Sequence, residues 1–343
     1  RSTLLASSAA SDVYKRQLTR PLIMRLSFYC VLEVCIEDPD EPKDPETPHF
    51  IPAYSQKVKA SKEFQTFQFD HSFVLNSLKS SMEGYVFHNQ PLDTDDLLEQ
   101  TVKLFNSCKT SLELFDMLHN MRAYDDSTYA HSLNVALICR RIGKWLKVDA
   151  ATLDTLTLCG LLHDIGKLKI PDEILNKPDK YTDEEFDLVK RHTKFGYELL
   201  KTLNIDPHIK KAALLHHERC DGSGYPLKAT QKDLDDFSMV VAIADVYDAM
   251  TAARSYRAPL CPFQVIERFE QEGLQKYKPK FILTFLQHIA STYQNNRVLL
   301  SNGQSANIVM LNQQHLARPI VQLNDNSCID LSTRLDLHIQ SIL

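Results

Sequence analysis

Between residues 125 and 253, apolar residues recur at helical spacing, and each stretch carries a histidine or an aspartate on its inner face or at its end. Such spacing predicts helices that bury one face. Imidazole and carboxylate groups rarely lie on a buried face without a partner. Seven residues share this placement: His131, His163, Asp164, His192, His216, His217 and Asp245. The pattern therefore predicts helices packed around a common polar centre.

The chemistry of these seven side chains favours a metal centre. They offer only nitrogen and oxygen ligands, which suits two divalent ions such as iron or manganese. A pair of such ions that shares a hydroxide is suited to phosphodiester hydrolysis. Adjacent helical residues point about 100° apart, so His216 and His217 can serve one centre only if their helix ends beside it. The alternative for this pair is a basic helix tail that compensates the helix dipole.

Local signals place the boundaries of these helices. Thr182–Glu185 has the composition of a capping box and predicts the start of a helix that carries His192. Asp206-Pro207 predicts the start of the helix that leads to His216. Gly166 suits a helix stop after the His163-Asp164 pair.

Composition excludes several classes of protein. The net charge of −5 argues against a nucleic-acid polymer as partner. Eight cysteines without a CxxC pair indicate reduced thiols and a cytoplasmic location. No apolar run approaches the roughly 18 residues of a membrane span, so we expect none.

The chain divides into regions of different character. Residues 12–17 have the sequence of a translated library-preparation transposon end, so we expect a non-native scar and a missing natural N-terminus. The alternation of apolar residues at 27–36 favours a strand, and the acidic, proline-rich stretch 37–48 favours a linker. The expected layout is a scar at 1–17, a remnant of an N-terminal β segment plus linker at 18–54, a helical region at 55–110, the helical domain with the seven residues at 111–295, and a small β appendage at 296–343.

Six ordered blocks of sequence resemble the HD-GYP subgroup of the HD phosphohydrolases. The resemblance covers roughly residues 110–295, and the blocks are His131–Ala136, His163–Lys167, His216–Arg219, Asp221–Pro226, Ile243–Met250 and Arg254–Arg257. It implies a mainly α protein, with an all-helical, metal-dependent HD-GYP phosphohydrolase domain at 111–295, a small C-terminal β appendage and a truncated N-terminal region. It also implies hydrolysis of the bacterial second messenger cyclic di-GMP to pGpG, with further hydrolysis to GMP left open.

The resemblance also implies a role for each site residue. One metal would be held by His131, His163, Asp164 and Asp245, and Asp164 would bridge to a second metal held by His192, His216 and His217. Lys167 would contact the scissile phosphate and offset developing charge, so Lys167 and Asp164 are the expected catalytic residues. The other expected substrate contacts are Tyr225, Asp248, Arg254 and Arg257. For Asp248, orientation of a metal ligand is the alternative.

One departure from relatives bears on the number of metals. Some relatives carry Glu one turn before His131 and bind a third ion, whereas this chain has Ser127. We therefore expect two divalent ions, iron or manganese. The alternatives are a phosphodiesterase for another cyclic dinucleotide, a non-catalytic nucleotide receptor or interaction module, and metal-dependent oxidation. Expected partners are cyclic di-GMP and signalling proteins such as a diguanylate cyclase, and a homodimer is compatible with the sequence.

Overall fold

The computed structural model describes residues 54–343 apart from 122–126, 178 and 253–259, and, before residue 54, the backbone of three short strands. The chain splits into two compact units, Arg1–Ile51 and Pro52–Leu343. In the first unit, β1 (Thr3–Leu5) pairs antiparallel with both β2 (Tyr14–Gln17) and β3 (Ile36–Glu37). The strand predicted at 27–36 lies outside the described residues except for Ile36.

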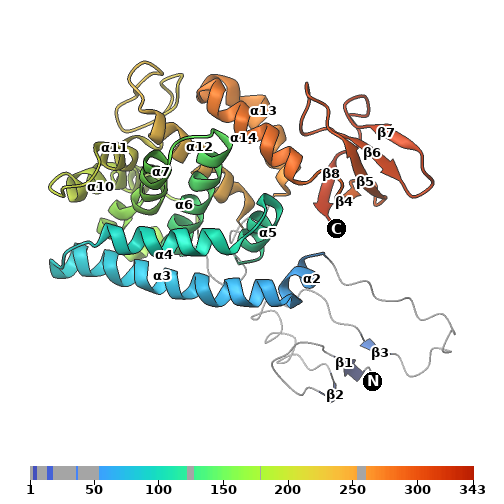
Figure 1. Ribbon diagram of the computed structural model, residues 1–343, viewed down its shortest axis with the longest axis horizontal. Helices are drawn as coiled ribbons and strands as arrows, with labels where there is room; N and C mark the ends of the chain where they lie inside the picture. The colour runs from blue at the N-terminus through green and yellow to red at the C-terminus, as the bar shows by residue number, and fades with distance from the viewer. Residues whose placement is uncertain are drawn as a thin grey trace. The chain divides into compact units, whose positions relative to one another are not determined.

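The second unit is mainly helical, as predicted, and ends in a small sheet (Figure 1). Its helices are α2 (Tyr54–Ala60), α3 (Lys62–His88), α4 (Thr94–Ser107), α5 (Ser111–Met121), α6 (Thr128–Trp145), α7 (Ala150–Leu162), the 3₁₀ turn η1 (Ile165–Lys169), α8 (Asp172–Leu175), α9 (Asp183–Lys190), α10 (His192–Leu200), α11 (Pro207–Leu215), α12 (Asp236–Thr251), α13 (Pro262–Lys276) and α14 (Pro279–Thr292). No helix in the described part of the chain has the length and apolar character needed to cross a membrane.

Helices α6, α7 and α12 pack against one another at the centre of this unit. A Cβ on Gly160 of α7 would lie 2.6 Å from the Cα of Ala136 on α6, so only glycine allows this approach. Fully buried side chains such as Leu133, Leu161 and Val241 fill the space between the three helices. This packing brings one candidate ligand from each helix to the same place.

The capping box is present, but the helix that it opens is shorter than predicted. Thr182 accepts from the backbone N–H of Glu185, whose side chain accepts from the N–H of Thr182. Helix α9 ends at Lys190, and His192 begins α10 instead of lying on α9. At this break the Val189 carbonyl accepts from the His192 imidazole and from the Arg191 N–H.

Gly166 does not stop a helix, because α7 already ends at Leu162 and Gly166 lies within η1. A Cβ there would lie 1.9 Å from the carbonyl oxygen of His192. Glycine is therefore needed for the close approach of η1 to α10, which places Asp164 beside His192.

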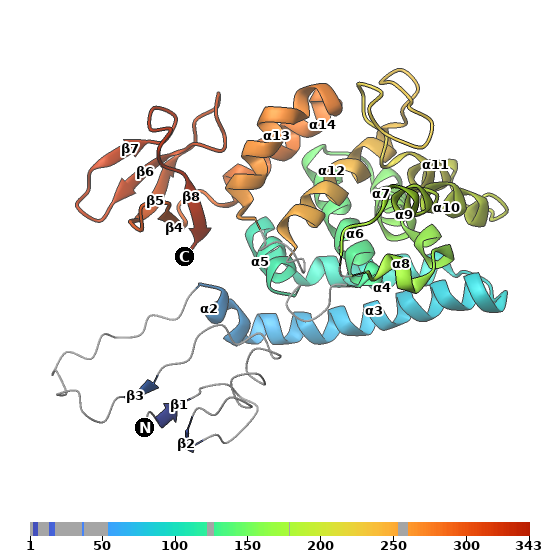
Figure 2. The same cartoon turned by 180° about the vertical axis from the view of Figure 1, so that it is seen from behind.

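The predicted C-terminal β appendage is a five-stranded antiparallel sheet in the order β7-β6-β5-β4-β8 (Figure 2). Its strands are β4 (Arg297–Leu300), β5 (Ser305–Met310), β6 (Ile320–Leu323), β7 (Cys328–Asp330) and β8 (Ile339–Ile342). It is fastened to α13, because Arg318 donates to Glu267 at 2.7 Å and the Leu316 N–H donates to Glu270 at 2.6 Å.

Candidate metal centre

The seven predicted ligand residues lie at helix ends or on inner helix faces that meet in one place. His131 and Asp245 project from α6 and α12, His163 directly follows α7, Asp164 precedes η1, His192 begins α10, and His216 and His217 follow α11. The chain leaves α11 at this point, so both adjacent histidines face the centre. For both histidines to serve one centre, their helix has to end beside it, and α11 ends there.

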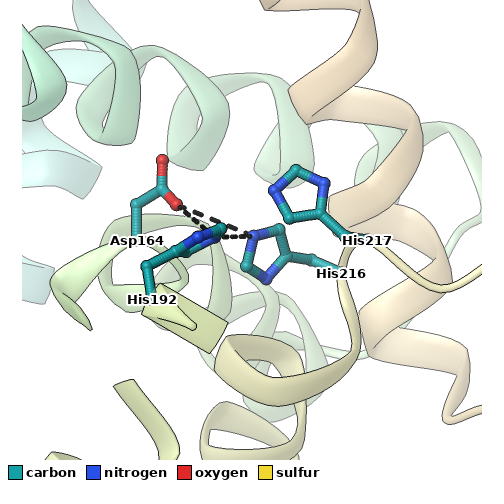
Figure 3. Close-up of side chains that lie close together, drawn as sticks. All are labelled: Asp164, His192, His216 and His217. Carbon is teal, nitrogen blue, oxygen red and sulfur yellow. Dashed lines mark hydrogen bonds and ion pairs between the residues drawn. The ribbon is translucent and has the colours of Figure 1, made fainter. Parts of the chain in front are cut away.

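One group of candidate ligands contains Asp164, His192, His216 and His217 (Figure 3). Its ligand atoms all lie within 4.8 Å of one another. Asp164 Oδ1 is 3.3 Å from His192 Nε2 and 3.6 Å from His216 Nε2. This spacing suits donors that surround one cation.

A second group contains His131, His163 and Asp164. Here the other oxygen of Asp164, Oδ2, is 3.3 Å from His163 Nε2 and 3.7 Å from His131 Nε2. Asp245 adjoins this group, with its Oδ1 3.1 Å from His131 Nε2. Asp164 therefore turns one carboxylate oxygen toward each group.

Three of the imidazoles are held in the same orientation by backbone carbonyls. The Nδ1 atoms of His163, His192 and His216 lie 2.7, 2.6 and 2.9 Å from the carbonyl oxygens of Gly160, Val189 and Ala212. Each Nδ1 donates to its carbonyl, and the Nε2 atom of each ring is directed toward Asp164. Such outer hydrogen bonds fix the tautomer of metal-binding histidines.

Burial and neighbouring charges keep most of these groups in the form that binds cations. Burial disfavours charged Asp164, but the Lys167 ammonium and His163 outweigh it and hold the pKa of Asp164 well below its usual range. Burial lowers the pKa of His192 to about 3 and also lowers the pKa of His216 and His217. These residues are thus a deprotonated carboxylate and neutral imidazoles at neutral pH.

His131 differs from the other histidines. Burial opposes its protonation, but hydrogen bonds to the carboxylates of Asp245 and Asp248 outweigh burial and raise the pKa of His131 to about 9. Its Nδ1 donates to Asp248 Oδ2 at 2.8 Å. A dication next to Nε2 would displace the proton there and take over the role of balancing the carboxylates.

Two buried atoms indicate that the cluster fits a metal. His163 Nε2 and Asp164 Oδ1 are inaccessible to water and make no hydrogen bond with any residue that the structure describes. A buried polar atom without a partner costs about 1–3 kcal/mol. A bound divalent ion would satisfy both atoms, so the histidine and aspartate cluster fits a metal site.

Two predicted substrate contacts lie beside the cluster. Lys167 Nζ is 2.5 Å from Asp164 Oδ2. The Tyr225 ring stacks on His217, with ring centroids 4.7 Å apart. Both side chains are partly exposed and border the cluster.

The other predicted contacts are placed differently. Asp248 is buried against His131, which favours the alternative in which it orients a metal ligand. Arg254 and Arg257 lie outside the described residues. Ser127 caps α6 by accepting from the Ala130 N–H at 3.2 Å, so its hydroxyl serves the helix start.

Glu218 is a site residue to which the sequence assigned no role. Its side chain is fully buried and accepts from the backbone N–H groups of Leu227 at 2.6 Å and Ala229 at 3.0 Å. It thereby fastens the loop that carries Tyr225 to the segment that carries His217. A glutamate directly after two candidate ligands was the available signal, but its partners are nine and eleven residues away.

A sequence model of the HD domain matches residues 96–281, more than half of the chain. The chain belongs to the HD domain family. This confirms the family resemblance drawn from the six sequence blocks. The adjacent His163 and Asp164 lie within the matched residues and at the middle of the cluster.

Curated relatives of this HD domain protein are bacterial phosphodiesterases. The 3'3'-cGAMP-specific phosphodiesterase 2 of Vibrio cholerae is 34% identical over 183 residues, which are 52% of this chain and 35% of that protein. The cyclic di-GMP phosphodiesterase PA4108 of Pseudomonas aeruginosa is 32% identical over 207 residues (60% and 50%), and the cyclic di-GMP phosphodiesterase of Thermotoga maritima is 35% identical over 178 residues (51% and 48%). The matches span half or less of each relative.

A solved structure shows the same fold. The HDG"Y"P protein Bd1817 from Bdellovibrio bacteriovorus superposes with a TM-score of 0.53 at 19% identity, over 66% of this chain and 76% of that one. At this identity the likeness concerns the fold alone.

Proposed function

We propose that this HD domain protein is a phosphodiesterase that hydrolyses cyclic di-GMP to pGpG with the help of two divalent ions, iron or manganese. The observation that carries the proposal is the position of Asp164, which directs one oxygen toward each of two histidine groups. A bridging carboxylate between two sets of imidazoles suits a binuclear centre of hard or borderline ions. Relatives named cyclic di-GMP phosphodiesterases support the substrate class.

The residues divide between the two ions. His131, His163, Asp164 and Asp245 would hold one ion, and Asp164, His192, His216 and His217 would hold the other. The bound ions would supply an acidified water molecule and polarise the scissile phosphate. Because Asp164 belongs to both sets, its negative charge would also offset the repulsion between the two cations.

The remaining residues would act on the substrate. Lys167 lies at hydrogen-bond distance from Asp164, so its ammonium can reach a phosphate held beside that carboxylate and offset charge that develops there. Arg254 and Arg257 would bind phosphate or guanine edges with planar guanidinium groups. Tyr225 would offer the free face of its ring to a base, since His217 occupies the other face.

A second candidate substrate is 3'3'-cGAMP. Relatives with this specificity match at 34% and 31% identity, and the two cyclic di-GMP phosphodiesterases match at 32% and 35%. A third outcome, nucleotide binding without turnover, would make the protein a receptor. A cytoplasmic location, a signalling partner such as a diguanylate cyclase and a homodimer stay predictions.

The test uses the full chain prepared without oxygen and loaded with Fe²⁺ or Mn²⁺. Cyclic di-GMP and 3'3'-cGAMP are incubated with it separately, and the products are resolved by chromatography against pGpG and GMP standards. We expect cyclic di-GMP to be consumed with pGpG as the first product, and a metal-free sample of the same protein to be inactive. Faster consumption of 3'3'-cGAMP would make 3'3'-cGAMP the substrate in place of cyclic di-GMP. Binding of either nucleotide without any product would contradict the proposed activity and indicate a receptor.

A further inference from the structure

Tyr247 lies on α12 between the two carboxylates of the site but faces away from them. It is two residues after Asp245 and one before Asp248, which places it about 200° and 100° around the helix from them. Its side chain is fully buried, and its ring meets Phe115 of α5 edge-on at 5.5 Å. Tyr247 therefore forms the back of the helix whose front carries the carboxylates.

His119 of α5 holds the hydroxyl of Tyr247. Its Nε2 is 3.2 Å from the Tyr247 hydroxyl, and its Nδ1 is 3.4 Å from the hydroxyl of Tyr293, the residue that directly follows α14. A neutral imidazole has one donor and one acceptor nitrogen, and each hydroxyl can complement either one. The two hydrogen bonds of His119 are directional, so they specify how far α12 is rotated and shifted against α5. Apolar packing alone would tolerate small slips.

The same helix α5 is held at a second place by α2, which packs on it. Tyr54, the first residue of α2, donates a hydrogen bond to the carboxylate of Asp116, one turn before His119. Tyr54 comes three residues after Ile51, where the first compact unit of the chain ends. Helix α5 thus lies between the start of the second unit and the back of the helix that carries Asp245 and Asp248.

We propose that Tyr247 is a positioning residue for the metal centre, and that Tyr54, through Asp116 and His119 on α5, makes the position of α12 depend on α2. The inference rests on the proposed metal-dependent function. Tyr247 touches neither substrate nor metal in this scheme, and acts by fixing the angle at which α12 presents its two carboxylates. Movement of α2 against α5 would therefore weaken metal binding at the site.

The test compares hydroxyl deletions in the full chain by titration of metal-free protein with Mn²⁺. Tyr247→Phe removes only the hydroxyl, and we expect the metal dissociation constant to rise about 3- to 30-fold. Tyr54→Phe should change it in the same direction, and the double variant should show less than the product of the two effects, because both act through α5. Tyr181→Phe is the matched control, since its hydroxyl donates to the Leu175 carbonyl away from α5 and α12.

A melting temperature for each metal-free variant separates positioning from ordinary stability. A merely structural role would lower the melting temperature of Tyr247→Phe and leave its metal affinity like that of Tyr181→Phe, and this result would overturn the proposal. An unchanged affinity in Tyr54→Phe alone would overturn the link to α2. Wild-type protein that binds Mn²⁺ but hydrolyses no cyclic dinucleotide would remove the proposed function and leave these comparisons valid. Wild-type protein that binds no metal would remove both.

Discussion

His131 and Asp248 lie 117 positions apart in the chain, yet Nδ1 of the histidine donates to Oδ2 of the aspartate at 2.8 Å. The opposite side of the ring, Nε2, faces Asp164 and Asp245. A carboxylate behind a histidine ligand fixes the ring and makes it a better donor to metal. We therefore propose that Asp248 orients His131, and the direct substrate contact that the family resemblance implies stays a prediction.

Replacement of this carboxylate separates the two roles. Asp248→Ala leaves Nδ1 of His131 without its acceptor, and we expect the Mn²⁺ affinity to fall about 10- to 100-fold. Asp248→Asn keeps an oxygen acceptor and should recover part of the loss. The measurement is metal titration together with the Michaelis constant at saturating metal. A raised Michaelis constant with unchanged metal affinity would instead put Asp248 in contact with the substrate.

The raised pKa of His131 predicts that metal binding releases a proton. In metal-free protein this pKa is about 9, so His131 is protonated at pH 7 and must lose its Nε2 proton when the metal binds. The apparent metal affinity should rise by about tenfold per pH unit below pH 9 and level off above it. Calorimetric titrations in buffers with different ionisation enthalpies count the released protons.

The same shift has the opposite effect on the metal-free fold. A raised folded-state pKa stabilises the protein fully below the ordinary histidine value of about 6.5, and this stability is lost as the pH rises through 9.

The control for the proton-release experiment is Asp248→Ala, which removes one of the two carboxylates beside His131 and should lower the number of protons released at pH 8. If wild-type protein releases no proton at pH 7, His131 is already neutral and the assignment of its charge is wrong.

Helix positions followed from the sequence because the signals for them are local. Spacing of apolar residues, the cap at Thr182 and Pro207 at the first turn of α11 all act within a few residues. The break between α9 and α10 was missed because no glycine or proline marks it. At the break, the His192 imidazole donates to the Val189 carbonyl.

The candidate ligands could be predicted from the sequence, whereas the contacts that orient them could not. Histidines and aspartates on apolar stripes are visible as a pattern, and the family blocks assign them to two ions. The partners of Glu218 are two backbone N–H groups, and a backbone group cannot be recognised from the residue types in a sequence. The Asp248 contact joins two helices that are distant in sequence, so only their packing reveals it.

The structure and sequence together predict about two metal ions per chain. Ser127 is engaged as the cap of α6, and a neutral hydroxyl adds no charge to offset a third dication. Asp164→Ala should lose metal from both positions and several orders of magnitude in rate, since its two oxygens face both groups. Elemental analysis of anaerobically prepared wild-type and variant protein provides the counts. Three tightly held ions in the wild type, or near-normal metal content in Asp164→Ala, would contradict this assignment.

Glu218 offers a test of the loop that carries Tyr225. Each of its oxygens accepts from one backbone N–H, so Glu218→Gln must place its NH₂ group against a donor and lose one hydrogen bond. Disruption of such a buried pair costs about 1–3 kcal/mol of unfolding free energy. A released loop also frees Tyr225 from its stack on His217, so we expect a raised Michaelis constant for the cyclic dinucleotide.

Tyr225→Phe is the companion variant, because it keeps the aromatic stack and leaves Glu218 in place. It should retain the stability of the wild type in urea unfolding, whereas Glu218→Gln should not. Because Glu218 directly follows His217, a loosened loop would weaken metal binding as well as substrate binding. Metal content, measured beside the Michaelis constant, separates these two effects. If Glu218→Gln keeps both wild-type stability and the wild-type Michaelis constant, the loop is held by its backbone alone. The close approach of Gly224 to the His217–Glu218 segment, where a Cβ would lie 2.4 Å from the Cα of Glu218, would then be the contact that fixes it.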